Sequence, residues 1–250
     1  MSNFTIKIYI IIIFLIIGCT SIEEKANLYS YDGDLVSLKD TISKIKKINF
    51  QDEKGWTPLM TAAENNQVSI IEYLVSQKVY LDIKNESGDT ALMRAVLNNN
   101  YKSAEILIKE GASLKIRDNR GYTPFLRACE KGNLDMAKLL IKDKSEFKDR
   151  VLLNPKKSAL HLAIKKNNLD IIKWLIENGL DINTKDEDGR TPIMDSVSNI
   201  KIPMVNFLLE KGASTNDISS NGENVLSISK QTFNQEMISL IENINPISKK

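Results

Sequence analysis

The stretch that decides the fold is Gly55-Trp56-Thr57-Pro58-Leu59-Met60, because close copies of it return along the chain at a nearly fixed distance. Matching segments begin 33 residues later at Gly88 and after 33 more at Gly121. Three further copies begin at Lys156, Gly189 and Gly222, at spacings of 35, 33 and 33 residues. Six occurrences on one period are hard to obtain by chance, so the chain is predicted to consist of repeats.

The rest of each unit predicts two helices joined by a turn. Asn or Gly stands nine residues after the Thr or Ser position in four units, and both tolerate the left-handed backbone of a helix end. Aliphatic pairs such as Ile70-Ile71 follow, with Leu74 three residues on, which is the spacing of one apolar helix face. Each unit therefore reads as turn, short helix, turn, longer helix and loop.

These features resemble the ankyrin repeat, whose fingerprint is Thr-Pro-Leu-His-x-Ala at a period of about 33 residues. The resemblance covers residues 28–245. It implies an all-α solenoid of about six helix-turn-helix repeats with short hairpin loops, capped at both ends and expected to be a monomer. The expected segments are a cap at 28–51, repeats at 52–84, 85–117, 118–152, 153–185, 186–218 and 219–245, and a tail at 246–250.

Two departures from the repeat pattern are notable. The connection 143–157 is longer than its equivalents and contains Pro155, which predicts a distorted or extended hairpin. Ile200 and Phe233 stand at the turn position that Asn or Gly occupies in the other units. The last unit has also lost its Thr-Pro pair, so we expect it to cap the far end.

The N-terminus has the features of a secretory signal. Ile8–Ile17 is an apolar run of about ten residues, too short for a bilayer that needs about 20. Ile16-Ile17-Gly18-Cys19 resembles a bacterial lipobox, which implies a signal peptide at 1–18, acylation of Cys19 and a short tether at 19–27. The protein would then be lipid-anchored in the bacterial cell envelope, facing the periplasm or the cell surface. An uncut signal anchor with an incidental cysteine is the alternative.

Composition excludes several classes of function. The net charge of +2 gives no argument for nucleic acid binding. Two cysteines and one histidine are too few for common metal or cofactor sites, so no cofactor is expected. His161 is expected to bond neighbouring loops, as the resemblance implies, and Cys129 to be a small buried residue. Asp186-Glu187-Asp188-Gly189 lacks the ligand spacing of a calcium loop.

The resemblance implies that a partner protein binds across the hairpin tips and the concave face of the first helices. We expect the residue between Gly and Thr to point off each tip and to offer a candidate for recognition: Trp56, Asp89, Tyr122, Lys157 and Arg190. For Trp56 the alternative is packing against the N-terminal cap. The first helices add Glu64, Asn65, Glu130 and Lys131.

The expected function is that of a non-enzymatic scaffold or adaptor that binds another protein outside the cytoplasm. An alternative from another class is an inhibitor or protective partner of a periplasmic or surface enzyme. A third is an enzyme whose site lies on the 143–157 connection. The sequence names no partner for any of these.

Overall fold

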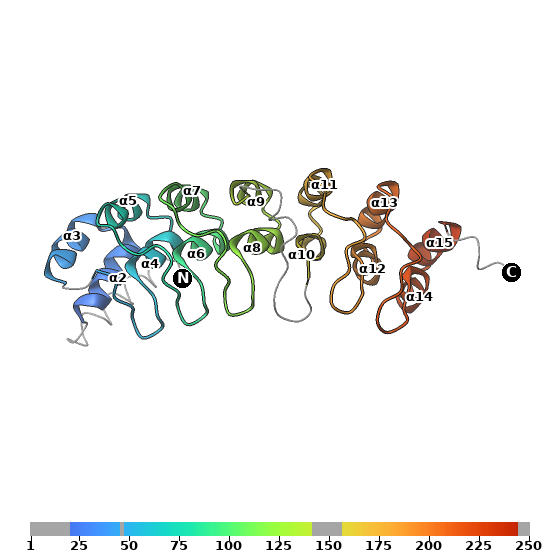
Figure 1. Ribbon diagram of the computed structural model, residues 1–250, viewed down its shortest axis with the longest axis horizontal. Coiled ribbons are helices and arrows are strands. Elements are labelled where there is room, and N and C mark those ends of the chain that lie inside the picture. The colour runs from blue at the N-terminus through green and yellow to red at the C-terminus, as the bar shows by residue number, and fades with distance from the viewer. Residues whose placement is uncertain (1–20, 46–47, 142–156, 245–250) are drawn as a thin grey trace, which may run out of the picture. The chain divides into compact units, whose positions relative to one another are not determined.

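The computed structural model describes residues 21–45, 48–141 and 157–244, and every regular element in these ranges is an α-helix (Figure 1). The chain divides into two compact units, Met1–Ser113 and Leu114–Lys250, which we call the N-terminal and the C-terminal unit. Each is a stack of ankyrin-type helix pairs, which confirms the predicted fold class.

The N-terminal unit contains three helix pairs among its described residues. Within each pair the two helices pack on each other, and the first helices of successive pairs are in contact. The helices are α2 (Ile22–Asp32), α3 (Leu35–Lys44), α4 (Pro58–Glu64), α5 (Val68–Ser76), α6 (Ala91–Leu97) and α7 (Tyr101–Lys109).

The C-terminal unit contains four pairs among its described residues, arranged in the same way. Contacts join α8 to α10, α10 to α12 and α12 to α14 along the row of first helices. The helices are α8 (Pro124–Lys131), α9 (Leu134–Leu139), α10 (Ala159–Lys166), α11 (Leu169–Glu177), α12 (Pro192–Ser198), α13 (Ile202–Glu210), α14 (Val225–Gln231) and α15 (Gln235–Ile244).

The repeated Thr-Pro pair starts the first helix of a repeat. Thr57 caps α4 by accepting a hydrogen bond from the Met60 backbone N–H at 3.2 Å, and Pro58 occupies the first helical position, where no N–H is required. Thr90 caps α6 in the same way through Met93, at 3.3 Å. The Thr of the repeat pattern is therefore a helix start signal.

Successive repeats are joined by apolar packing and by polar side chains that reach back. Leu59, Ile70, Ile71 and Leu74 are all at most 3% exposed. The Asn100 side chain donates to the carbonyls of Ala63 and Glu64 in the preceding repeat, at 2.9 and 2.7 Å. Because these carbonyls lie at the open end of α4, Asn100 caps the neighbouring helix as well as linking two repeats.

The hairpin loops also approach one another closely. Gly55 has a φ of +76°, and a Cβ atom there would lie 3.0 Å from both the Cα of Asn85 and the backbone N of Glu86. The Glu86 N–H donates to the Lys54 carbonyl at 3.1 Å. Gly55 thus allows both a left-handed turn and contact with the next hairpin, and Gly189 does the same against Ser219 and Ser220.

One expected boundary changes. Helix α2 begins at Ile22, so residues 22–27 are helical and do not form a tether, and the cap starts six residues earlier than expected. The cause is a capping box: Ser21 Oγ accepts from the Glu24 N–H at 3.1 Å, and Glu24 Oε2 accepts from the Ser21 N–H at 2.9 Å. Cys19 and residues 142–156 of the long connection lie outside the described residues. Within the described ranges, no helix has the length and apolar character needed to cross a membrane.

Candidate protein-binding site

The geometry of the hairpins decides which side chains a partner can reach. The Asp52 N–H donates to the Trp56 carbonyl at 2.9 Å, and Asp52 Oδ1 accepts from the N–H groups of Lys54 and Trp56. Residues 52 and 56 therefore pair across the stem of the hairpin, and the tip is formed by the residues between them. The same pairing joins Asn85 to Asp89, Asp118 to Tyr122 and Asp186 to Arg190.

The expectation that the residue between Gly and Thr points off the tip is therefore wrong. Asp89 is 4% exposed and Tyr122 is 8% exposed. Trp56, Lys157 and Arg190 are half-buried. Since these positions close the stem, their side chains turn back onto the first helices, where they meet partners of their own and of neighbouring repeats.

In the N-terminal unit these partners form what we call the Arg94 cluster: Arg94 with Trp56, Glu64 and Asp89. The Arg94 guanidinium lies 4.6 Å from the centre of the Trp56 ring and 3.0 Å from Asp89, and it also pairs with Glu64. Trp56 and Glu64 belong to the preceding repeat. Arg94 thus links two repeats through a cation–π contact with Trp56 and an ion pair with Glu64, and Trp56 packs against the next repeat.

A second cluster, around Arg127, lies in the C-terminal unit. Arg127 pairs with the buried Asp118 and, at 2.7 Å, with Glu130, and its guanidinium lies 3.9 Å from the Tyr122 ring centre. The Tyr122 hydroxyl donates to Glu130 at 3.2 Å. Burial, and then the Glu130 carboxylate, raise the pKa of Tyr122. Burial alone would lower the pKa of Arg127, but its bonds to Glu130 and Asp118 outweigh burial and raise it.

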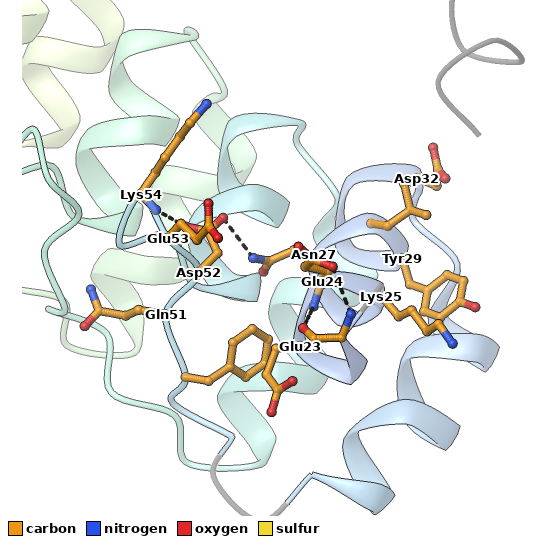
Figure 2. Close-up of a pocket in the computed structure, with 13 residues that line it drawn as sticks. Glu23, Glu24, Lys25, Asn27, Tyr29, Asp32, Gln51, Asp52, Glu53 and Lys54 are labelled. Atoms are coloured by element: carbon orange, nitrogen blue, oxygen red, sulfur yellow. Dashed lines mark hydrogen bonds between the residues drawn. The ribbon is translucent and has the colours of Figure 1, made fainter. Parts of the chain in front are cut away.

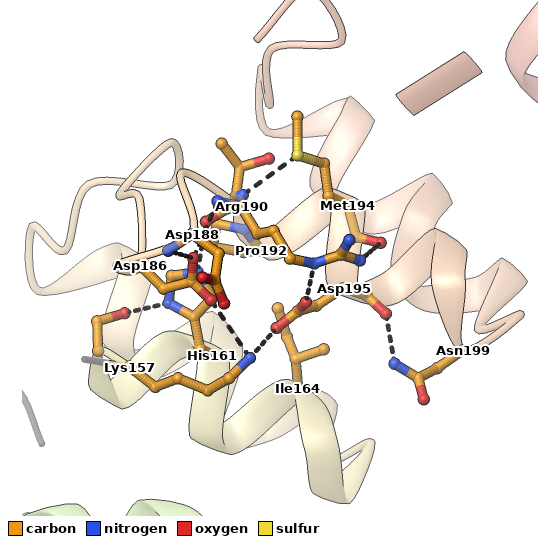
Figure 3. A network of polar contacts seen from close by, with 12 residues as sticks. Lys157, His161, Ile164, Asp186, Asp188, Arg190, Pro192, Met194, Asp195 and Asn199 are labelled. Carbon is orange, nitrogen blue, oxygen red and sulfur yellow. Dashed lines mark hydrogen bonds and ion pairs between the residues drawn. The ribbon is translucent and has the colours of Figure 1, made fainter. Parts of the chain in front are cut away.

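The third, which we call the Asp195 cluster, contains Lys157, Asp186, Arg190 and Asp195, which Figure 3 shows, together with Glu223. Lys157 Nζ lies 2.8 Å from Asp195 and 3.5 Å from Asp186, and Arg190 bonds Asp195 at 3.1 Å and Glu223 at 3.3 Å. Burial alone would raise the pKa of Asp195, but the ion pair with Lys157 overcomes this and holds the pKa below its ordinary value. Three successive repeats meet in this cluster.

Most of the side chains that a partner can reach are not these stem residues but their neighbours in the hairpins and on the first helices. In the five hairpins that the structure describes, the two residues before the glycine are exposed: Glu53 and Lys54, Glu86 and Ser87, Asn119 and Arg120, Glu187 and Asp188, Ser220 and Asn221. On the first helices Lys131 is exposed and Asn65 half-buried, whereas the carboxylates of Glu64 and Glu130 are engaged by Arg94 and Arg127. The signal for this arrangement was the Asp or Asn that stands four residues before Trp56, Asp89, Tyr122 and Arg190, because its side chain closes an Asx turn.

A groove of about 920 Å³ lies at the start of the N-terminal unit, between α2 and residues 50–54 of the first hairpin (Figure 2). One bond crosses it, from the Asn27 side chain to Asp52 at 3.3 Å. Carboxylates outnumber ammonium groups on its lining, which includes Glu23, Glu24, Lys25, Asp32, Asp52, Glu53 and Lys54. Its charge would favour a basic or neutral segment over an acidic one.

Comparison with known proteins settles the family. The family model for ankyrin repeats in three copies matches residues 27–118, 110–186 and 160–248. The chain belongs to the ankyrin repeat family. Repeats of this family mediate protein–protein interaction, and no catalytic family is indicated.

Two solved structures resemble nearly the whole ankyrin chain. The human ASB11 ankyrin repeat domain superposes with a TM-score of 0.74 at 17% identity, covering 87% of this chain and 97% of that one, and shows the fold alone. A chain from the complex of the predatory endopeptidase Bd0816 of Bdellovibrio bacteriovorus with the immunity protein Bd3460 is 29% identical, with a TM-score of 0.52, over 88% of this chain and 97% of that one.

Curated relatives match over short segments. A putative ankyrin repeat protein of fowlpox virus is 40% identical over 25% of this chain and 14% of its own length. The phosphocholine transferase AnkX of Legionella pneumophila is 33% identical over 31% of this chain and 8% of its own length. The matches therefore span a small part of these proteins and concern the repeats.

His161 takes the structural role expected of an ankyrin histidine. It is 1% exposed, with Nδ1 2.8 Å from Ser158 Oγ and Nε2 3.0 Å from the Arg190 carbonyl of the next repeat. Because a carbonyl can only accept, Nε2 carries the proton and Nδ1 accepts from Ser158. Burial, more than any other influence, lowers the pKa of His161.

The cluster around His161 does not fit a metal ion. His161, Asp186 and Asp195 each place one ligand atom within 4.8 Å of the others. However, both ring nitrogens of His161 are already in hydrogen bonds, and the Lys157 ammonium lies between the two carboxylates. This ammonium supplies the positive charge that the two carboxylates need.

Cys129 is a buried small residue of the ankyrin core, as expected. It is 0% exposed, and burial raises the pKa of its thiol far above the ordinary value. A thiol that is neither exposed nor ionised is a poor nucleophile.

Proposed function

We propose that this protein is a lipid-anchored, non-enzymatic binding protein of the bacterial cell envelope that holds another protein through its hairpin tips and first helices. The observation that carries the binding surface is the contrast, within each hairpin that the structure describes, between a cross-linked stem that is buried or half-buried and two exposed tip residues. A rigid row of tips loses little conformational entropy on binding. The lipobox-like Ile16-Ile17-Gly18-Cys19 supports the anchor and the location outside the cytoplasm.

A second proposal concerns the class of partner. The resemblance at 29% identity to a chain from an endopeptidase–immunity protein complex runs along 88% of this chain. This favours a protein that restrains or protects against an enzyme of the envelope over a general scaffold. The partner would then be an endopeptidase, and the bound state would be the one with lowered enzyme activity.

The first experiment is capture in intact cells. The full chain would be expressed with a C-terminal tag in its own host and cross-linked, beside a tip variant (Lys54→Ala, Arg120→Ala, Asp188→Ala) and a Cys19→Ser variant. The matched control changes three exposed charges on second helices (Lys102→Ala, Lys138→Ala, Glu177→Ala). We expect one dominant partner that is lost in the tip variant and retained in the control.

The same strains test the anchor and the enzyme partner separately. The Cys19→Ser protein should leave the membrane fraction, and its retention there would contradict lipid anchoring without touching the binding proposal. If an endopeptidase is captured, adding the purified chain should lower the activity of that enzyme in proportion to the amount of chain added. Unchanged activity with firm binding would leave a scaffold or adaptor as the function.

A further inference from the structure

Two inter-helix turns of the C-terminal unit carry residues that their backbone disfavours. Ile200 and Phe233 have φ values of +54° and +55°. The equivalent turns of other repeats use Asn66, Asn99 and Asn167, with φ between +55° and +58°, or Gly132. A β-branched or bulky residue in this region is a rare outlier, since its Cβ crowds the backbone.

The two side chains are also exposed, so burial in the fold does not explain them. Phe233 is 91% exposed, the highest value among the large apolar side chains of the described residues, and Ile200 is 44% exposed. They occupy the same position in consecutive repeats, whose first helices α12 and α14 pack on each other. A strained backbone and an exposed apolar side chain both disfavour these residues, and both features occur together at two adjacent turns.

The first helices α10 and α14 have basic side chains in their last turns, whereas the second helices α11 and α15 have the acidic Asp170 and Glu236 in their first turns. Lys165 and Lys166 lie in the last turn of α10 and Lys230 in that of α14; all three are exposed, and Lys230 pairs with Glu242 at 3.8 Å. A lysine at a helix C-terminus is favoured by the helix dipole, so these lysines alone mark no site. The N-terminal unit differs at the same places, because α4 has no basic residue in its last turn and the one in α6, Arg94, belongs to the Arg94 cluster.

We propose that Ile200 and Phe233, with Lys165, Lys166 and Lys230, form a docking patch for an acidic surface of a partner protein that presents an apolar side chain. This turn patch rests on the proposed protein-binding function and adds a place and a chemistry to it. Three exposed lysines are fewer than the about four to eight basic residues that recognise an anionic lipid surface, which favours a protein over a membrane. An aromatic side chain framed by charges is typical of an interface anchor.

The test begins with a photo-cross-linking analogue of phenylalanine at position 233 in the full chain, in the native host. The same analogue at Tyr80, which is 70% exposed in the N-terminal unit, is the matched control. The protein captured at 233 would be identified, its cross-linked peptide mapped and the protein purified as the probe. We expect one protein, joined at a surface rich in Asp and Glu.

The decisive variant is Ile200→Asn with Phe233→Asn, which restores the residue used at the equivalent turns of other repeats. We expect its affinity for the purified probe to fall by roughly tenfold to a hundredfold, while the chain melts at an equal or higher temperature. Lys165→Glu with Lys166→Glu should also weaken binding, by about tenfold. Tyr80→Asn should leave the affinity within about twofold.

Several outcomes would overturn the patch. In the cross-linking experiment, these are the absence of a product at position 233, or cross-links only to this chain's own residues or to a second copy. In the binding experiment, they are an unchanged affinity of the Ile200→Asn, Phe233→Asn variant, or a loss of binding that accompanies a loss of stability. Binding to phosphatidylglycerol vesicles that disappears in the same variant would assign the patch to a membrane instead. If a partner is still captured through the hairpin tips, the proposed function stands and only this inference fails.

Discussion

The Arg94 and Asp195 clusters use opposite charges at the same place in the repeat. Arg94 lies five residues after Asp89, and Asp195 lies five residues after Arg190, each in the first helix of its repeat. Arg94 is a cation that attracts Asp89, Glu64 and the Trp56 ring. Asp195 is an anion that attracts Lys157 and Arg190.

The difference shows that the geometry of this position is fixed while the sign of its charge is free. In both units the stem residue of the preceding hairpin reaches forward to the helix of the next repeat, as Trp56 does to Arg94 and Lys157 to Asp195. Three of the side chains that vary along the chain in this row, Trp56, Lys157 and Arg190, are therefore links between repeats. Their variation is no sign that a partner is recognised there.

The central side chains of the two clusters also differ in burial, and the more deeply buried Asp195 carries the largest predicted effect. In the C-terminal unit the Asp186 and Asp195 side chains are 1% and 13% exposed. We expect Asp195→Ala to lower the free energy of unfolding by about 3 kcal/mol, because Lys157 and Arg190 lose a shared buried partner. Urea unfolding followed by circular dichroism measures this. Asp188→Ala, at an exposed tip, should change it by less than about 0.5 kcal/mol, and equal losses would contradict the cluster.

The Arg94 cluster should be weaker, since its central side chain is more exposed than Asp195 is. The Arg94, Glu64 and Asp89 side chains are 19%, 29% and 6% exposed. We expect Arg94→Met to lower the free energy of unfolding by about 2 kcal/mol, mostly through the stranded Asp89. The same urea titration applies, with Lys54→Met as an exposed control. A loss as large as that of Asp195→Ala would show that depth does not separate the two clusters.

The repeat fold could be predicted from the sequence, but the orientation of the hairpins could not be predicted as easily. The Gly-x-Thr copies at 55, 88, 121 and 189 fix both the period and the helix starts. The side-chain direction at Trp56 depends on which residues pair across the stem, and only the Asp or Asn four positions earlier reveals that. The pairing of Lys157 with Asp195, 38 residues apart, arises from packing between repeats and has no local signal.

The early start of α2 had a signal in Ser21 and Glu24, which have the spacing of a capping box. The candidate residues of the binding site on the first helices could be predicted only in part. Lys131 is exposed as expected of a first-helix residue, but Glu64 and Glu130 are engaged by arginines that only the folded structure brings to them.

A smaller effect, a dependence of stability on pH, is specific to the C-terminal unit, because that unit contains His161, the one histidine of the chain. Burial is the main reason that the pKa of His161 is lowered from 6.5 in the folded protein. The folded state thus binds this proton less readily than the unfolded state. The stability from neutral His161 is present above about pH 6.5 and is lost as the pH falls from there towards the lowered folded pKa.

His161→Met, which installs the residue found at the same position in three other repeats (Met60, Met93 and Met194), should remove this slope. We expect wild-type protein to lose stability as the pH falls from 7 to 5.5, because the unfolded state takes up a proton that the folded state binds less readily, and the variant to lose almost none. Thermal melts across this range measure the difference. The pKa of Asp195 is held below 3.8, so this carboxylate does not change its charge between pH 7 and pH 5.5. If the stability of the variant fell with pH as steeply as that of the wild type, the role of His161 would be contradicted.

The smallest effect is expected where charges meet on the surface. Lys44 and Asp40 of α3 pair at 2.5 Å, but their side chains are 58% and 65% exposed. Water screens such a pair, and holding two long side chains costs entropy, so Lys44→Met should change the free energy of unfolding by only about 0.3 kcal/mol. This pair is shorter than the 2.8 Å contact between Lys157 and Asp195. If urea titration found comparable losses for both, distance rather than burial would control these ion pairs, and the contrast between the Arg94 and Asp195 clusters would need another cause.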